Sequence, residues 1–178
     1  MSYAKELSEI TGYAMATGFG LTTHYYNTKH GLIPEEAVSF CTISDYVAFS
    51  IAREKAPLLH QSMAASLGVY DIQKGCFDTE AIERAGMDIR MLPQVTKENA
   101  LCGKTAEGIP VAVSLGDNQA SFLGSVNEEC KVLLNVGTGA QLSAYSEKIA
   151  EGENLECRPY VGDSWLLAGS ALCGGYAY

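Results

Sequence analysis

Residues 109–124 read IPVAVSLGDNQASFLG, and three structural signals follow one another within them. The β-branched run from Ile109 to Leu115 predicts a strand, and the small residues from Asn118 to Gly124 predict a helix. Gly116-Asp117 lies at the step between the two. A strand, a sharp turn and a helix in succession are typical of α/β folds, in which ligands bind at the carboxyl ends of strands. We therefore expect an α/β protein in which Asp117 projects into a cleft with Asn118 beside it.

Two interpretations of Asp117 are open at this point. Phosphoryl transfer from ATP to an alcohol needs a carboxylate near the hydroxyl, and Asp117 is a candidate for that general base. An aspartate in front of a helix is also a favoured N-cap, worth about 1 kcal/mol. By spacing alone the N-cap is the commoner use of such a residue.

A second glycine turn lies further along the chain. Lys131 to Val136 predicts a strand, Gln141 to Tyr145 predicts its hairpin partner, and Gly137-Thr138-Gly139 joins them. Amides in such a turn can approach a phosphate and the threonine hydroxyl can donate to it, but a plain hairpin turn has the same composition. Further short strands are predicted at 156–160 and 164–168. This change of pattern predicts a domain boundary between residues 126 and 131.

Upstream of residue 109 the patterns predict mainly short helices. The predicted helices cover residues 2–10, residues 21–29, a segment that opens at Pro34-Glu35-Glu36, residues 44–52 capped by Ser44, and residues 78–85 closed by Gly86. Phe40 to Ile43 is predicted as a short apolar strand. The three histidines, His24, His30 and His60, lie on separate predicted elements, so we interpret them as packing or surface residues.

Composition excludes some classes of function. Hydrophobic residues make up 47% of the 178 residues and charged residues 19%, which is typical of a folded globular protein. The formal net charge is −9 with only twelve lysines and arginines, which argues against nucleic-acid binding because that binding rests on cations that neutralise phosphates. No apolar run reaches membrane-spanning length, and the first ten residues do not read as a signal peptide. We expect neither nucleic acid nor a membrane as a partner.

The six cysteines are dispersed, and no histidine stands at metal-ligand spacing from them. We interpret them as reduced, mostly buried thiols. The sequence therefore predicts no metal-ligating residue and a cytoplasmic location.

Five segments together resemble the FGGY family of carbohydrate kinases. They occur in the same order as in that family, and the match spans nearly the whole chain. They are TGYAMATGF at 11–19, ISDYVAFSIA at 43–52, CFDTEAIERAGMDIRMLPQV at 76–95, GDNQASFLGSV at 116–126 and GTGAQ from 137. The details are most similar to sedoheptulokinase-like and xylulokinase-like members.

The resemblance implies a two-domain, actin-like (ribonuclease-H-like) ATPase fold, with residues 1–128 in the sugar domain and 129–178 in the ATP domain. It implies ATP with Mg²⁺ as cofactors and a small sugar as substrate. Asp117 would take the proton from a terminal sugar hydroxyl, Asn118 would contact the sugar, and Gly137, Thr138 and Gly139 would contact the terminal phosphates of ATP. Gly18 stands where glycerol kinases of the family carry an aromatic residue, so we expect a roomier sugar pocket than theirs.

Family members also carry a D-x-G-T phosphate loop before the matching region and an adenosine-binding motif after it, and neither is in these 178 residues. We therefore expect a fragment with little or no activity by itself, and a homodimer formed through exposed strand edges. The main alternative is a non-catalytic, sugar-binding remnant of such a kinase. An actin-like structural module is less favoured, because it has no use for the GDNQA turn.

Overall fold

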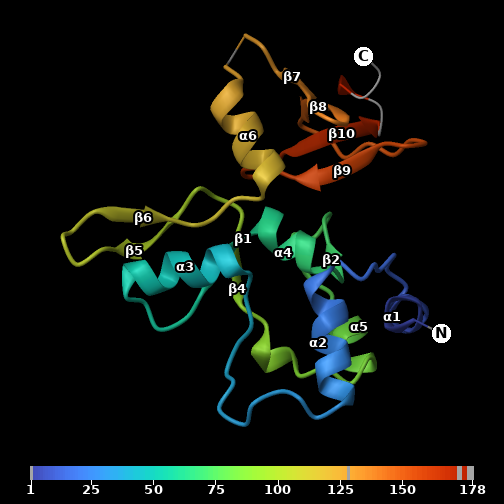
Figure 1. The fold of residues 1–178 in the computed structure, drawn as a ribbon, viewed down its shortest axis with the longest axis vertical. Helices are drawn as coiled ribbons and strands as arrows, with labels where there is room; N and C mark the ends of the chain where they lie inside the picture. The colour runs from blue at the N-terminus through green and yellow to red at the C-terminus, as the bar shows by residue number, and fades with distance from the viewer. Residues whose placement is uncertain (1, 128, 172–173, 176–178) are drawn as a thin grey trace. The chain divides into compact units, whose positions relative to one another are not determined.

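The computed structural model describes residues 2–127, 129–171 and 174–175. The chain forms two compact units, Met1–Ser114 and Leu115–Tyr178, whose elements are labelled in Figure 1. Each unit has its own hydrophobic core. Helix α6 packs with the strands that follow it in sequence. The predicted boundary between a sugar domain and an ATP domain after residue 128 stays a prediction.

Two packed helices open the first unit, as the sequence predicts. Helix α1 (Tyr3–Thr11) is capped by the Ser2 hydroxyl, which accepts a hydrogen bond from the Lys5 amide, and it ends at Gly12 in the left-handed conformation (φ +81°). Helix α2 (Gly20–Lys29) follows. Their facing sides bury Leu7 and Leu21 completely, in the core of the unit.

Short elements complete this unit. They are α3 (Ile43–Ala52), β1 (Leu58–His60), α4 (Gln61–Leu67), β2 (Tyr70–Asp71), β3 (Cys76–Phe77), α5 (Thr79–Arg84), the 3₁₀ turn η1 (Ile89–Met91), β4 (Gln94–Thr96), β5 (Leu101–Lys104) and β6 (Pro110–Ala112). Strands β1 and β4 pair in parallel, whereas β2 with β3 and β5 with β6 form antiparallel pairs. The predicted helix at 78–85 is confirmed as α5, with Asp78 as its N-cap.

Three local predictions in this unit are wrong. Pro34–Glu36 forms a turn and not a helix. Phe40 to Ile43 is not a strand, because Phe40 stacks on His24 and its amide donates to the Met91 carbonyl instead of to a neighbouring strand. The cap of α3 is Thr42, whose hydroxyl accepts from the Asp45 amide, and not Ser44.

The predicted strand over Ile109–Leu115 shrinks to the three residues of β6. Its pairing with β5 is irregular between Leu101 and Gly103, and Gly103 has a φ of +155°. Proline at 110 has no amide to donate, which also limits the ladder. Residues 113–116 therefore lead into the next unit as an irregular connection.

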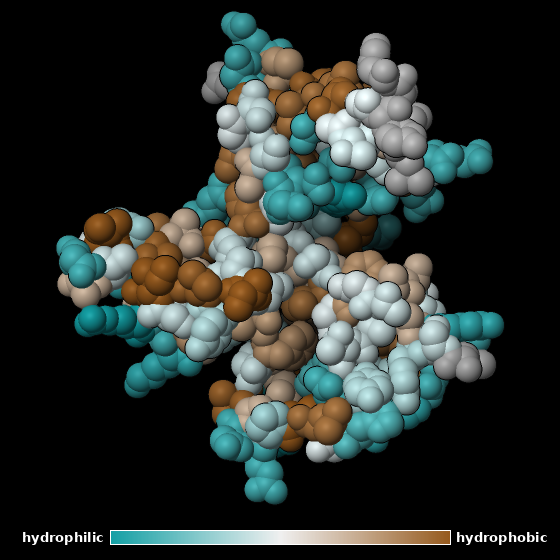
Figure 2. All heavy atoms as spheres, in the orientation of Figure 1, coloured by the Kyte–Doolittle hydropathy of each residue, from teal (hydrophilic) through white to brown (hydrophobic). Residues whose placement is uncertain are grey.

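Helix α3 leaves one of its faces in solvent. The side chains of Ile43, Tyr46, Val47 and Ile51 follow the helical spacing and are all exposed, Ile43 to 79%. Figure 2 shows hydrophobic side chains gathered over this helix.

The second unit is one helix on an antiparallel sheet. It contains α6 (Asp117–Ser125), β7 (Val132–Val136), β8 (Ala140–Ser146), β9 (Glu156–Pro159) and β10 (Trp165–Ala171), with strand order β7-β8-β10-β9. Figure 1 shows α6 beside this sheet. Phe122 from the helix packs edge-to-face on Tyr160, and both belong to one core cluster with the buried Leu166 of β10. The strands predicted after residue 131 are thus confirmed.

Two further observations concern the described residues as a whole. The described cysteines are free thiols, as predicted, but the prediction that most are buried is wrong: Cys41, Cys102 and Cys157 are half-buried, and Cys76 and Cys130 are exposed. Cys173 lies outside the described residues. None of the helices among the described residues has the length and hydropathy needed to cross a membrane.

Candidate functional site

The carboxylate of Asp117 is not a helix cap. Gly116 occupies the N-cap position of α6 and makes no side-chain capping bond, while Asp117 is the first residue inside the helix. Its Oδ1 accepts a hydrogen bond from the amide of Asn118 at 2.7 Å, and the residue is exposed. This geometry rules out the N-cap interpretation and leaves an acidic group at the positive end of a helix, accessible to a ligand.

The side chain of Asn118 is hydrogen-bonded to the sheet. Its Oδ1 accepts a hydrogen bond from Nε2 of Gln141 on β8 at 2.7 Å, and the same nitrogen donates to the Ser143 hydroxyl at 3.0 Å. The next residue, Gln119, is buried and donates from Nε2 to the Pro159 carbonyl at 3.0 Å. These bonds tie the first turn of α6 to the strands beneath it.

The turn Gly137-Thr138-Gly139 joins β7 to β8, and all three residues are exposed. Two of its carbonyls accept hydrogen bonds from a second glycine pair: Gly174 donates to Thr138 at 3.0 Å, and Gly175 donates to Gly137 at 2.6 Å. A Cβ at position 174 would lie 2.5 Å from the carbonyl carbon and oxygen of Gly139. Only glycine fits there, so the turn is built from two segments that are distant in sequence.

Gly18 lies in the other unit, in the turn between α1 and α2. It is exposed, and a Cβ built on it would have no atom within 4 Å. The loop before it is anchored by Tyr13, whose hydroxyl donates to Oδ2 of Asp78 at 3.2 Å. Burial, together with the charge of Asp78, raises the pKa of Tyr13 to about 12, so this hydroxyl stays a donor at neutral pH.

Most of the predicted site residues therefore belong to one unit, and one of them belongs to the other. The unit Leu115–Tyr178 contains Asp117, Asn118 and the Gly137–Gly139 turn. Within it, Gln141 links strand β8 to helix α6 through its hydrogen bond to Asn118. Gly18 belongs to Met1–Ser114. Sequence reasoning missed Gln141, Ser143 and the Gly174–Gly175 pair. The GTGAQ segment contains Gln141 but does not say what its side chain contacts.

Two buried polar residues of the first unit serve its structure. Asp45 is 1% exposed, and its carboxylate accepts hydrogen bonds from the hydroxyls of Thr42 and Ser114. His60 is completely buried: Nδ1 accepts from the Ser62 amide, which leaves Nε2 to donate to the Lys97 carbonyl. Burial lowers the pKa of His60, and the histidine is a packing residue, as predicted.

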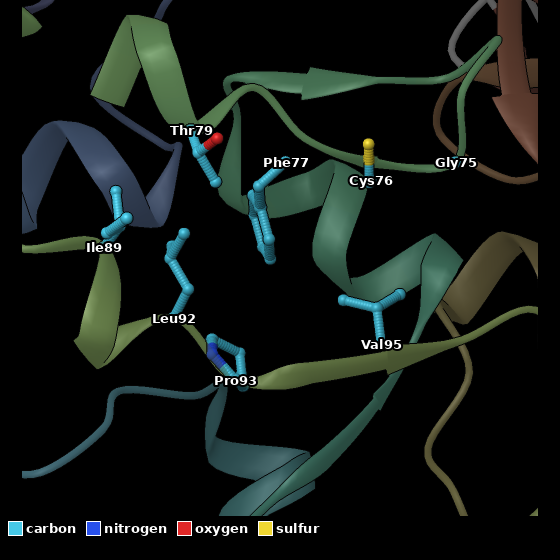
Figure 3. A pocket seen from close by; sticks show the side chains of 8 residues that line it. All are labelled: Gly75, Cys76, Phe77, Thr79, Ile89, Leu92, Pro93 and Val95. Carbon is cyan, nitrogen blue, oxygen red and sulfur yellow. The ribbon is translucent and has the colours of Figure 1, made fainter. Parts of the chain in front are cut away.

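An open pocket of about 370 Å³ lies in the first unit (Figure 3). Its walls are mainly apolar, and they consist of Gly75, Cys76, Phe77, Thr79, Ile89, Leu92, Pro93 and Val95. No residue predicted for catalysis or binding lines it.

Comparison with known proteins identifies the family. The model of the N-terminal domain of the FGGY family of carbohydrate kinases matches residues 2–124, which is more than half of the chain. The chain belongs to the FGGY family of carbohydrate kinases. Among curated relatives of this FGGY protein, the sedoheptulokinase of Mus musculus is 31% identical over 141 residues. That alignment covers 74% of the chain but 29% of the sedoheptulokinase, so the chain spans less than a third of its relative's length.

Solved structures agree on the fold of this FGGY chain. A xylulose kinase from Rhodospirillum rubrum superposes with a TM-score of 0.75 at 16% identity, covering 98% of the chain and 38% of the kinase. A glycerol kinase from Plasmodium falciparum, solved with ADP, gives a TM-score of 0.75 at 16% identity, covering 94% of the chain and 37% of that kinase. The predicted fold class, an α/β chain with the actin-like ATPase fold, is thereby confirmed.

Proposed function

We propose that the protein containing this chain transfers the terminal phosphoryl group of ATP to the terminal hydroxyl of a ketose or polyol, with Asp117 as the general base. One observation carries the proposal: Asp117 is exposed at the first position of α6 and is not consumed as a cap. A carboxylate at this position can accept the hydroxyl proton as the oxygen attacks phosphorus.

The chain's residues have distinct parts in this reaction. Asn118 binds a second oxygen of the sugar and so orients the attacking hydroxyl. The backbone of Gly137, Thr138 and Gly139 contacts the terminal phosphates, and the Thr138 hydroxyl donates to them. The close packing of Gly174 against Gly139 supports this assignment, because a rigid glycine turn lets phosphate oxygens approach the main chain.

ATP and Mg²⁺ complete the proposed site. Among the described residues, no group of three or more acidic, histidine or cysteine side chains is placed to hold a metal ion. We propose that Mg²⁺ is bound through the phosphates and water, as is common for this ion. When bound, Mg²⁺ offsets the charge that develops on the transferred group. The ADP named with the Plasmodium falciparum glycerol kinase supports an adenine nucleotide as donor.

A ketose or a longer polyol is the proposed substrate class. Gly18 is exposed, and a Cβ built on it would meet no atom within 4 Å. It stands where glycerol kinases of the family carry an aromatic residue, and we take this difference to favour a sugar larger than glycerol. The 31% identity to a sedoheptulokinase supports the same class. In this proposal residues 1–128 belong to the sugar domain and residues 129–178 begin the ATP domain, and the protein is a cytoplasmic homodimer.

A second candidate concerns the 178-residue polypeptide by itself. Because it spans 29% of the length of the Mus musculus sedoheptulokinase, we propose that the isolated polypeptide has little or no turnover. It would then act at most as a sugar-binding remnant. Calorimetric titration of the isolated polypeptide with ATP and with ketoses measures what binding it retains, and robust turnover by it would contradict this candidate.

A coupled assay of ADP release tests the main proposal. The intact protein that contains residues 1–178 is assayed with ATP, Mg²⁺ and a panel of ketoses, polyols and glycerol. We expect turnover with at least one ketose or longer polyol and a lower kcat/KM with glycerol. Absence of ADP release with every acceptor would sink the proposal, and size-exclusion chromatography with light scattering decides the homodimer.

A further inference from the structure

The side chain of Gln141 is committed to two partners. Gln141 lies on β8, two positions after the Gly137–Gly139 turn, and is half-buried. Its Nε2 carries two hydrogens; one is donated to Oδ1 of Asn118 at 2.7 Å and the other to the hydroxyl of Ser143 at 3.0 Å. Ser143 is 4% exposed, so the Gln141 amide is fixed from the interior of the unit.

This arrangement orients the carboxamide of Asn118. A carboxamide has one oxygen that accepts and one nitrogen that donates two hydrogen bonds. If the Asn118 carboxamide alone rotated by half a turn, its NH₂ would face the NH₂ of Gln141, and the bond between the two side chains would be lost. The Asn118 oxygen is therefore held toward β8, and its Nδ2 group remains for a ligand, since none of the described residues accepts a hydrogen bond from it.

We propose that Gln141 is a positioning residue of the sugar site, which holds Asn118 so that its NH₂ donates to a substrate oxygen next to the hydroxyl that is phosphorylated. This inference rests on the proposed kinase function and adds a specificity rule to it. Asp117 and Asn118 are consecutive in a helix, so their side chains diverge and address two different groups of the substrate. Asp117 accepts a proton, whereas Asn118 donates one in a hydrogen bond. The acceptable sugars are those with an oxygen at the carbon beside the reacting one.

The hydrogen bond from Gln141 to Asn118 connects the strand after the proposed phosphate turn with the residue proposed to contact the sugar. Strand β8 begins directly after the turn proposed to hold the phosphates, and it carries Gln141. Through Gln141 this strand also holds Asn118 at the start of α6. The distance between the turn proposed to contact phosphates and the amide proposed to contact the sugar is thus set within one compact unit.

A double-mutant cycle on the intact protein tests the inference. Gln141→Ala is expected to raise the sugar KM about five- to tenfold while kcat changes less than about twofold, because the loss is one of ordered substrate binding. In an Asn118→Ala background the same substitution should have no further effect on KM, because Gln141 acts through Asn118. Equal effects in both backgrounds would overturn the inference.

Two more variants separate orientation from general loosening. Gln119→Leu removes the neighbouring glutamine that bonds the Pro159 carbonyl, so it should lower the melting temperature and leave the sugar KM unchanged. Gln141→Glu keeps the side-chain length but offers only oxygens, so Asn118 turns its NH₂ toward residue 141 and the sugar KM stays raised. A Gln141→Glu protein with the wild-type KM would contradict the orienting role.

Side-chain NMR gives a readout that does not need activity. In the wild-type protein without substrate, the ¹⁵N-labelled Asn118 NH₂ group should show restricted motion, and in Gln141→Ala it should become mobile on the picosecond to nanosecond timescale. If its mobility is unchanged, the inference is wrong even where ADP is released. If instead no sugar is phosphorylated but the mobility changes, the proposed function fails and the positioning of Asn118 by Gln141 stands.

Discussion

Replacing Asp117 with asparagine separates the chemistry of this residue from its structural part. An asparagine oxygen can still accept the hydrogen bond from the Asn118 amide, and Gly116, not Asp117, is at the N-cap position. The structural loss is then the negative charge at the first turn of α6, about 0.3–1 kcal/mol of stability. The catalytic loss is expected to be larger, because removing a general base lowers the rate by roughly 10²–10⁴-fold. That range corresponds to about 2.7–5.4 kcal/mol of transition-state stabilisation.

The assay measures kcat and sugar binding of Asp117→Asn in the intact protein, with the melting temperature as a check on folding. Sugar affinity should stay within a few-fold of wild type. Asp88→Asn is the matched control, since Asp88 is the N-cap of η1 and its Oδ1 accepts the Arg90 amide, and it should leave kcat unchanged. A kcat for Asp117→Asn within about threefold of wild type would refute the reasoning and make Asp117 a helix-charge residue only.

Three other outcomes are expected. Burial holds the pKa of His60 in the folded protein below its ordinary 6.5, so the unfolded chain binds more protons as the pH falls through that range. The melting temperature should therefore be steady above pH 6.5 and fall below it. The fall should be smaller in His60→Gln. A steeper or equal fall in His60→Gln would contradict this. Gly174→Ala forces a methyl group against Gly139. It should raise the KM for ATP on the order of tenfold to a hundredfold and leave the sugar affinity unchanged. An unchanged KM for ATP would show that the Gly137–Gly139 turn does not bind phosphate. Phe122→Ala should cost about 3–5 kcal/mol in urea unfolding, and a cost below about 1 kcal/mol would show that its contact with Tyr160 is not a core contact.

The sequence predicts the second unit better than the first, for a physical reason. Strands β7 and β8 are neighbours in sequence and pair through a short glycine turn, so local pattern and pairing coincide. In the first unit β1 pairs in parallel with β4, which lies far along the chain, and each has only three residues. Such short pairings arise from tertiary packing and leave too few residues for a period to be recognised.

Phe40 illustrates the opposite error. It lies in a short apolar run that fits a buried strand, but it is buried by stacking on His24 of α2. Hydrophobicity indicates that the segment faces a core and does not tell which element covers it.

The residues of the candidate site also differ in whether a local sequence pattern points to them. Asp117 and the Gly137–Gly139 turn can be proposed from the sequence because each belongs to a recognisable motif within one segment, and their roles stay predictions. Gln141 is not, because a glutamine on a strand has no local signature and its meaning comes from a contact with Asn118, on another element. The N-cap interpretation of Asp117 likewise needed coordinates, since a shift of one residue in the start of α6 decides it.

The bonds from Gly174 and Gly175 to the Gly137–Gly139 turn have a consequence for the order in which the protein is made. During synthesis the β7–β8 hairpin leaves the ribosome before β10, which pairs with β8, and before the glycines that donate to the turn carbonyls. A nascent chain that has reached only β9 therefore has the turn residues but not the bonds that shape them. Because domains fold as units while the chain is being extended, the turn proposed to contact phosphates would gain these bonds only late in translation, after Gly175 has emerged.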